Sequence, residues 1–208
     1  MELTILGTGN MARGIGTRAV AAGHNVTLLG TEEGKAQELA EELGGSTKTG
    51  TVGDPLTGDV VVAAVWYPVT LEVARRYGDE LDDKVVVDIS NPVDVDAFEP
   101  IVPEGGSGAE ELAAAAPKAR VVKAFNTTFA GTLAGGGEVG GQPLDVFLAA
   151  DDDGAKQTVA GLVESMGLRP VDSGPLRRAR QLEATGYLHM AVQEPLGTGF
   201  GSTVKIVS

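Results

Sequence analysis

The chain has 208 residues, of which 42% are hydrophobic and only 4% aromatic, so one large domain with a core of Val, Leu, Ile and Ala is expected. Its 16 Lys and Arg residues against 29 Asp and Glu residues give a net charge of −13, which argues against binding to nucleic acid or to an anionic membrane. The absence of cysteine excludes disulfides, thiolate metal sites and a cysteine nucleophile.

The first predicted strand covers residues 2–6 and has no basic or apolar leader segment before it. No apolar stretch approaches the roughly 18 residues that a membrane span needs. We therefore expect a cytoplasmic protein without membrane contact.

The rest of the chain alternates between predicted helices and strands. We expect helices over residues 10–22, 33–43, 68–81, 110–116, 153–166 and 175–194, and further strands over residues 26–29, 59–65, 84–89, 120–125, 144–149 and 169–171. This alternation predicts an α/β fold with a doubly wound, mostly parallel sheet of the Rossmann NAD(P)-binding type. Because no long linker interrupts it, we expect a dinucleotide-binding domain over residues 1–173, with residues 174–208 forming a short C-terminal helical extension packed on it.

The turn after the first strand carries the pattern Gly-x-Gly-x-x-Ala. Gly7 permits a tight turn, Gly9 lets the backbone approach a pyrophosphate, and Ala12 allows close packing of helix on strand. The free amides at the helix start and the helix dipole then favour phosphate. Since strand, turn, helix and second strand follow at the expected spacing, we predict a dinucleotide site rather than a structural turn. The candidate contacts are Gly7, Thr8, Gly9, Asn10, Met11 and Ala12.

The end of the second predicted strand bears on the choice between NADP and NAD. An acidic residue there usually binds the ribose hydroxyls of NAD, whereas basic and hydroxyl residues bind the 2′-phosphate of NADP. Thr31 and Lys35 suit a phosphate, but Glu32 would repel one if it pointed inward. Glu32 is explained equally well as an exposed acid at a helix start, so both nucleotides remain candidates.

Three further strand ends fall at the carboxyl edge of the sheet, where ligands of open α/β sheets bind. Asn91 and Asn126 follow successive strands and offer amide donors and acceptors beside the predicted nicotinamide path, which favours a function over simple turn formation. Trp66 could stack on a ring, but packing of a helix against the sheet is the preferred interpretation. The other candidate contacts at these strand ends are Val65, Tyr67, Pro68, Pro92 and Ala124.

The sequence offers no acid–base pair with an orienting partner, so no side chain is predicted to be catalytic. We interpret His189 as a buried or interfacial helix residue, and Lys123 as part of a structural ion pair at a strand end. No residues have the spacing of metal ligands, and the run Asp151-Asp152-Asp153 is interpreted as a helix cap.

Several of these segments together resemble a known family, the deazaflavin-dependent NADP reductases. The resemblance rests on residues 5–11, 30–31, 90–92, 122–127 and 179–183, in this order, and covers nearly the whole chain. It implies an oxidoreductase that carries hydride between NADP and the 8-hydroxy-5-deazaflavin coenzyme F420.

The resemblance also implies roles for individual residues. It places Thr31 and Lys35 at the 2′-phosphate, whereas Glu32 stands where the family usually has arginine and so favours a shift toward NADH. The residues implied at the pyrophosphate turn are Thr8, Asn10 and Met11, and those implied at the nicotinamide end are Trp66, Tyr67, Asn91 and Asn126.

Two other functions stay open. The first is a small NAD(P)H-dependent reductase of another acceptor, such as an imine, a carbonyl, a metal or a flavin, since the same turn occurs in pyrroline-carboxylate-type reductases. Those enzymes have a larger helical C-terminal domain than residues 175–208 would form. The second is a nucleotide-sensing protein without turnover. The expected partners are small-molecule coenzymes and, through the apolar last helix, a second copy of the chain in a homodimer.

Overall fold

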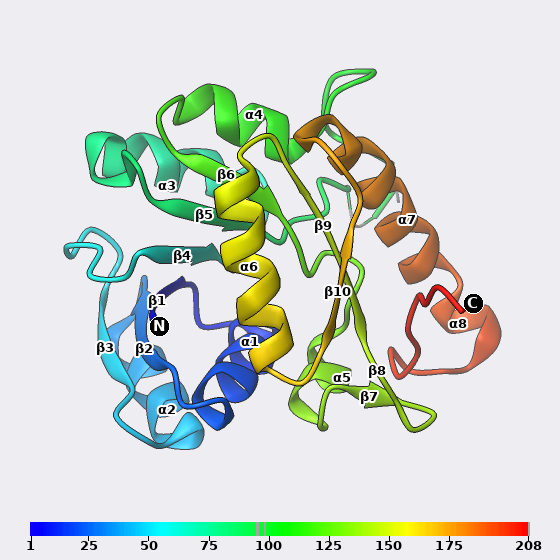
Figure 1. Ribbon diagram of the computed structural model, residues 1–208, viewed down its shortest axis with the longest axis horizontal. Coiled ribbons are helices and arrows are strands. Elements are labelled where there is room, and N and C mark those ends of the chain that lie inside the picture. Colours follow the sequence, from blue (N-terminus) through cyan, green and yellow to red (C-terminus); the bar gives the residue numbers. More distant parts are fainter. Residues whose placement is uncertain (95, 98, 208) are drawn as a thin grey trace.

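The computed structural model describes residues 1–94, 96–97 and 99–207; Ser208, at the end of the predicted extension, lies outside them. Within the described residues, eight strands form one sheet in the order β10-β9-β6-β5-β4-β1-β2-β3 (Figure 1). Its strands are β1 (Glu2–Leu6), β2 (Asn25–Gly30), β3 (Lys48–Thr51), β4 (Val60–Ala63), β5 (Val85–Asp88), β6 (Arg120–Lys123), β9 (Asp145–Ala150) and β10 (Arg169–Asp172). A separate hairpin pairs β7 (Glu138–Val139) with β8 (Gln142–Pro143).

Helices cover both faces of the sheet. The helices are α1 (Asn10–Ala21), α2 (Glu33–Leu43), α3 (Val69–Tyr77), α4 (Gly108–Ala115), α5 (Ala130–Ala134), α6 (Asp153–Ser165), α7 (Ala179–Ala191) and α8 (Gln193–Leu196), with 3-10 turns η1 (Gly78–Leu81) and η2 (Leu176–Arg178). One apolar cluster joins the sheet to α1, α2, α5 and α6, and a second joins it to α3, α4 and the start of α7. This double cover explains why the central strands β4 and β5 are apolar without alternation.

The order in which the chain adds strands to the sheet reverses at β1. This strand pairs in parallel with β2 on one side and with β4 on the other, so the connections leave toward opposite edges. In open α/β sheets, such a switch point opens a crevice at the carboxyl ends of the strands, where ligands bind. The expected Rossmann-type architecture is therefore confirmed, and the turn after β1 lies at the switch point.

Some parts of the fold differ from the expectation. Strand β3 was missed, because its residues Lys48–Thr51 are polar and form a partly exposed edge strand that no apolar run marks. The helix expected over residues 175–194 consists of η2, α7 and the start of α8. Strand β9 is antiparallel to β6, so the sheet is mostly, not wholly, parallel.

The segment after α8 returns to the sheet. The ammonium of Lys205 and the backbone N–H of Ile206 both bind the carboxylate of Asp145 at the start of β9, each at 2.9 Å. Val204 packs beside Phe147 and Leu182. The C-terminal segment therefore contacts the same sheet as the N-terminal half.

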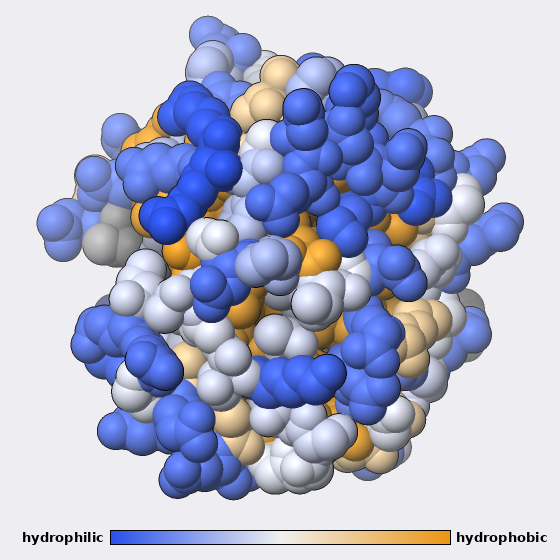
Figure 2. Space-filling model, turned by 90° about the vertical axis from the view of Figure 1, so that its left-hand side faces the viewer, coloured by the Kyte–Doolittle hydropathy of each residue, from blue (hydrophilic) through white to orange (hydrophobic). Residues whose placement is uncertain are grey.

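The surface agrees with the acidic composition. Figure 2 shows the side on which α2, α3 and β3 lie in Figure 1, and this side is mostly hydrophilic or neutral, with smaller apolar patches between the hydrophilic side chains. Among the described residues, no helix has both the length and the apolar character required to span a bilayer.

Candidate functional site

The turn after β1 is shaped by two glycines with different surroundings. Gly7 has φ +111°, and a Cβ there would lie 2.4 Å from the carbonyl oxygen of Ala64 at the end of β4. Gly7 is therefore required by the close approach of β1 and β4. A Cβ on Gly9, by contrast, would meet no atom of the described residues within 4 Å, so the backbone of Gly9 is open to an approaching group.

The start of α1 has the features of an anion site. Gly9 is its N-cap in an extended conformation, and within the described chain no side chain caps it and no acidic residue occupies its first turn. The first amides of a helix have no partners inside the helix, and the helix dipole places partial positive charge beside them. Ala12 is fully buried, so α1 packs closely behind the turn. The turn therefore fits a diphosphate, as a group held by backbone amides.

The end of β2 brings Thr8, Gly30 and Glu32 together. A Cβ on Gly30 would lie 2.9 Å from Cγ2 of Thr8 and 3.2 Å from the carbonyl oxygen of Glu32, so only glycine leaves room for the Thr8 side chain here. This packing joins the turn after β1 to the loop that reads the ribose in folds of this type.

Glu32 and Lys35 form an ion pair at the start of α2. The Lys35 ammonium donates to Glu32 Oε1 at 2.6 Å, and the side chains are 61% and 64% exposed. The hydrogen bond and charge of Glu32 raise the pKa of Lys35. Thr31 beside them is also exposed. The three residues thus lie together as expected, but the carboxylate that would repel a phosphate engages the lysine that would bind it.

Trp66 and Tyr67, which follow β4, differ in how far they are exposed. Trp66 is 68% exposed, so the interpretation that it packs a helix against the sheet is wrong. Tyr67 is half-buried and donates a hydrogen bond to Glu111 on α4. Burial, followed by Glu111, raises the pKa of Tyr67 well above its usual range. The exposed Trp66 ring is therefore available to a ligand, whereas the Tyr67 hydroxyl is engaged by α4.

Asn91 and Asn126 lie against each other at the ends of β5 and β6. Asn91 Nδ2 donates to the carbonyl oxygen of Asn126 at 2.7 Å, and Asn126 Nδ2 donates to Asn91 Oδ1 at 2.9 Å and to the carbonyl oxygen of Leu182 at 2.8 Å. The pairing of these two candidates was not expected. Of their neighbours among the candidate contacts, Pro92 is buried and Ala124 is fully buried.

Unpaired polar atoms surround this edge of the sheet. Among the described residues, four buried side-chain oxygens have no hydrogen-bond partner. They belong to Thr70 in α3, Ser90 after β5, and Asn126 and Thr127 after β6. Buried polar groups normally have partners, so this concentration indicates an edge suited to polar groups that are not part of the chain.

Lys123, Asp88 and Glu183 form a buried charge cluster near the amide pair, and of these only Lys123 is expected from the sequence to form an ion pair. The ammonium of Lys123 contacts Asp88 at 2.8 Å and Glu183 at 2.8 Å, which confirms the predicted ion pair at a strand end. Asp88 could have been noticed, because it ends an apolar strand opposite Lys123. Glu183 carries no such signal, because its position depends on how α7 packs.

The predictions that His189 is a buried helix residue and that the acidic run caps a helix are confirmed. His189 is buried, with its ring nitrogens near Thr127 O (3.2 Å) and Ser202 Oγ (2.8 Å), and burial lowers its pKa. Asp152 is the N-cap of α6 and accepts a hydrogen bond from the backbone N–H of Ala155 at 2.6 Å.

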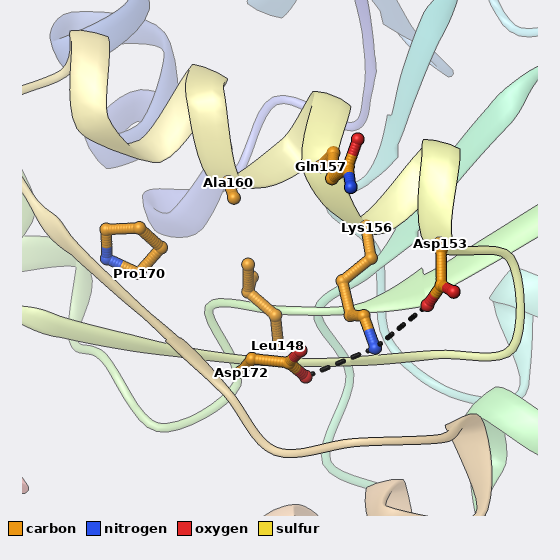
Figure 3. Close-up of a pocket in the computed structure, with 7 residues that line it drawn as sticks. All are labelled: Leu148, Asp153, Lys156, Gln157, Ala160, Pro170 and Asp172. Carbon is orange, nitrogen blue, oxygen red and sulfur yellow. Dashed lines mark ion pairs between the residues drawn. The ribbon is translucent and has the colours of Figure 1, made fainter.

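Two hollows in the surface lie outside the turn after β1. One, of about 380 Å³, lies between α6 and β10; there Lys156 pairs with Asp153 at 3.5 Å and with Asp172 at 3.2 Å (Figure 3). Its lysine is thus already engaged. The other, of about 840 Å³, is lined by residues of α7, α8 and the following loop, including Met190, Gln193 and Phe200.

The second hollow borders the end of β6. The Phe200 ring meets the Phe129 ring edge-on, with centroids 5.1 Å apart, and Phe129 is the N-cap of α5, three residues after Asn126. The His189 ring also lies next to Phe129, with ring centroids 4.3 Å apart. Phe200, which lines this hollow, therefore joins it to Phe129 in the segment that follows β6.

Comparisons with known proteins agree with this geometry. The family model described as NADP oxidoreductase, coenzyme F420-dependent, matches residues 2–92. The chain is 33% identical to the metalloreductase STEAP3 of Rattus norvegicus over 88% of its own length, but it covers only 36% of that protein. It is 29% identical to the F420-dependent NADP reductase of Methanothermobacter thermautotrophicus, with 88% of this chain and 85% of the other covered.

A solved structure extends the similarity over the full length. The crystal structure of a protein from Arthrobacter sp. fb24, assigned as an F420-dependent NADP-reductase, matches with a TM-score of 0.86 and 25% identity, covering 99% of both chains. The chain thus spans about a third of the STEAP3 relative and nearly all of the Arthrobacter protein. By its fold and by these similarities, the chain is a Rossmann-type protein whose residues 2–92 match the coenzyme F420-dependent NADP oxidoreductase family.

Proposed function

We propose that this protein transfers hydride between NADP(H), bound at the carboxyl edge of the sheet, and the deazaflavin coenzyme F420. The observation that carries the proposal is the turn after β1: Gly7 fits a close approach of two strands, Gly9 is open, and the first amides of α1 are uncapped within the described chain. A diphosphate is the group that such a turn holds in Rossmann-type folds.

The backbone amides of residues 8–12 would bind the diphosphate, with Thr31 and Lys35 at the adenosine ribose. The amide pair of Asn91 and Asn126 would hold the nicotinamide end, because the two residues follow β5 and β6, which lie two and three strands from β1 in the same sheet. Trp66, which is exposed beside this path, would cover a bound ring. The remaining proposed contacts are Val65, Tyr67, Pro68, Pro92 and Ala124.

The chain's own contribution to the reaction is to bind and orient. When bound, the two coenzymes would supply both reacting carbons, so hydride transfer would need no side chain of the protein as donor or acceptor. Fixing the distance and angle between two rings lowers the entropic part of the barrier, and exclusion of water protects the hydride donor. These roles of the protein and the coenzymes are consistent with the proposal that no side chain acts as an acid or base.

The C-terminal extension would bind the second coenzyme. We assign residues 1–173 to the dinucleotide-binding domain and residues 174–208 to an extension on the same sheet. The hollow around Met190 and Phe200 is apolar, partly aromatic and large enough for a planar ring system, and it borders the end of β6.

A second candidate function is reduction of a different acceptor, such as a flavin or a metal complex. The similarity to a metalloreductase over most of this chain favours it. Both candidates use the same nucleotide site and differ only in the electron acceptor.

The test is a parallel titration and turnover experiment on the purified protein. We expect saturable binding of NADPH by calorimetry, and oxidation of NADPH that requires F420 and is slower with FMN, FAD or ferric citrate. Faster turnover with flavin or ferric citrate would favour the second candidate. Binding of NADPH without turnover on any acceptor would favour a nucleotide sensor, and absence of binding would contradict the proposal.

We also propose that the protein forms a homodimer through α7 and α8. Leu188 and Leu196 are each 65% exposed on these helices, and burial of both against a second copy would remove apolar surface from water. Light scattering should give twice the mass of the chain, and a monomeric mass at micromolar concentration would contradict the proposal.

A further inference from the structure

A lysine with no access to solvent lies at the end of β6. The side chain of Lys123 is fully buried, and its ammonium donates to Asp88 Oδ2 at 2.8 Å, to Glu183 Oε1 at 2.8 Å and to the carbonyl oxygen of Ser90 at 2.5 Å. All three donors of the ammonium are therefore satisfied. Since a buried charge is costly unless it is paired, the three partners fix one another's positions.

Glu183 connects this cluster to two helices. It belongs to α7, and its carboxylate also accepts hydrogen bonds from the backbone N–H groups of Gly108 at 3.1 Å and Ala109 at 3.4 Å, at the start of α4. An anion at this end of a helix is favoured by the helix dipole. One side chain thus joins α7 to α4, and through Lys123 to the ends of β5 and β6.

The same turns of α7 touch the amide pair of the proposed nicotinamide end. The carbonyl oxygen of Leu182, next to Glu183, accepts a hydrogen bond from Asn126. One helical turn later, a Cβ on Gly186 would lie 2.5 Å from Asn91 Oδ1, so the helix backbone packs directly on the Asn91 amide. The position of α7 therefore sets the orientation of both amides.

We propose that Glu183 is a positioning residue of the hydride-transfer site. Its ion pair with Lys123 fixes α7 relative to the ends of β5 and β6, so that the α7 backbone at Leu182 and Gly186 orients the amide pair of Asn91 and Asn126. The inference rests on the proposed function for the role of the amides. The geometric half of the inference, that the ion pair sets the amides, does not depend on any ligand.

A nearby ion pair supplies a matched control. Arg180 and Glu110 also join α7 to α4, with two hydrogen bonds at 2.7 and 2.6 Å, but they lie at the surface and do not reach β5 or β6. If attachment of α7 to α4 were all that mattered, removal of either pair would have the same effect. Of these two ion pairs, the one at Glu183 reaches the ends of β5 and β6, and the one at Arg180 does not.

The experiment compares Glu183→Gln with Arg180→Gln, two substitutions that each remove one charge from α7. The side-chain oxygen of the introduced glutamine could still accept from Gly108, so the first variant loses mainly the charge opposite Lys123. Without any ligand, NMR spectra should show shifted side-chain amide signals of Asn91 and Asn126 in Glu183→Gln and unshifted signals in Arg180→Gln. Unshifted signals in both variants would overturn the inference.

A second measurement uses turnover. In Glu183→Gln, kcat should fall about tenfold or more, as small misplacements of reacting groups do, while the dissociation constant for NADPH stays within about twofold, because the diphosphate turn is untouched. Unchanged kcat together with unchanged amide signals would overturn the proposal. If the wild-type protein neither binds NADPH nor turns over, the proposed function fails, whereas the amide signals still decide whether Glu183 positions the pair.

A third variant covers the case in which Glu183→Gln does not fold. Gly186→Ala leaves every charge in place and suits a helix, but its Cβ would press on the Asn91 amide. It should reproduce the amide shifts and the fall in kcat. Wild-type amide signals and kcat in this variant would show that α7 does not control the pair.

Discussion

Asn91 and Asn126 exchange hydrogen bonds across the ends of two neighbouring strands: each side-chain amide donates to the other residue, at 2.7 and 2.9 Å. The carbonyl of the Asn126 side chain has no partner among the described residues. The two amides are therefore ordered by each other and by the backbone of α7, and one buried acceptor is left at the edge of the sheet. A nicotinamide carboxamide has an NH₂ group of the kind that such an acceptor would bind.

Replacement of Asn91 by alanine should lower both the turnover number and the stability of the protein. Asn91→Ala removes both hydrogen bonds of the pair, so we expect a fall in kcat of about tenfold or more and a loss of roughly 1–3 kcal/mol in the free energy of unfolding. Steady-state kinetics and urea unfolding measure the two effects. Asn25→Ala, which removes a surface asparagine paired with Glu2, is the control and should leave kcat unchanged. Equal kcat values for wild type and Asn91→Ala would remove the pair from the site.

The two glycines of the turn after β1 should respond in opposite ways to alanine. Gly9→Ala meets open space, so the melting temperature should stay close to that of the wild type, while the added methyl group blocks the diphosphate and raises the Kd for NADPH at least tenfold, or about 1.4 kcal/mol. Gly7→Ala combines φ +111° with a contact to Ala64 O, so it should lower the melting temperature markedly. Thermal melts and calorimetric titration check both. If Gly9→Ala binds NADPH like the wild type, the turn does not hold the diphosphate.

The choice between NADPH and NADH should depend on the exposed pair of Glu32 and Lys35. Glu32→Gln releases the Lys35 ammonium and removes a negative charge, so the ratio of kcat/KM for NADPH to that for NADH should rise several-fold, and Glu32→Arg should raise it further. Exposed ion pairs contribute little to stability, so the free energy of unfolding should change by less than about 1 kcal/mol.

The control is Glu33→Gln, which neutralises the neighbouring exposed acid in the first turn of α2. It should change the ratio less than Glu32→Gln does. Identical ratios in the two variants would mean that Glu32 acts only through the general charge of the surface, and an unchanged ratio in Glu32→Arg would place the ribose elsewhere.

The parts of the fold that depend on neighbouring residues along the chain could be predicted from the sequence. The turn at residues 7–12 and the apolar runs of β4 and β5 led to the Rossmann-type sheet, since glycine positions and periodicity reflect backbone needs directly. The polar edge strand β3 has no such pattern. Trp66 was misjudged because a large apolar side chain is usually buried, and its position before Pro68 gives no information about exposure.

The least predictable part of the site is the part that joins distant segments. The partners of Lys123 come from β5 and from α7, which are 35 and 60 residues away along the chain. A single lysine at a strand end suggests an ion pair but does not identify the carboxylates. The same holds for the amide pair, because its geometry depends on the packing of α7 against two strands.

The attachment of the C-terminal segment should depend on pH through Asp145. Burial alone would raise the pKa of this carboxyl, but Arg169, the Ile206 amide and Lys205 lower it to about 2. A depressed pKa in the folded state means that the ionised form stabilises the fold above about pH 4, the value in an unfolded chain, and that this contribution is lost as the pH falls toward 2. The shift corresponds to roughly 2 kcal/mol at neutral pH.

Asp145→Asn should therefore be less stable than the wild type by about 2 kcal/mol at neutral pH, because it leaves Arg169 and Lys205 without their charge partner. The difference in free energy of unfolding between the wild type and Asp145→Asn should become smaller below about pH 4, because the wild-type carboxyl then binds protons more readily in the unfolded state. Urea unfolding at a series of pH values measures it, with Asp153→Asn, an exposed acid facing Lys156, as the control that should show almost no difference. A difference between Asp145→Asn and the wild type that stays constant from neutral pH down to about pH 3 would mean that the tail is held by packing around Val204 rather than by the charge of Asp145.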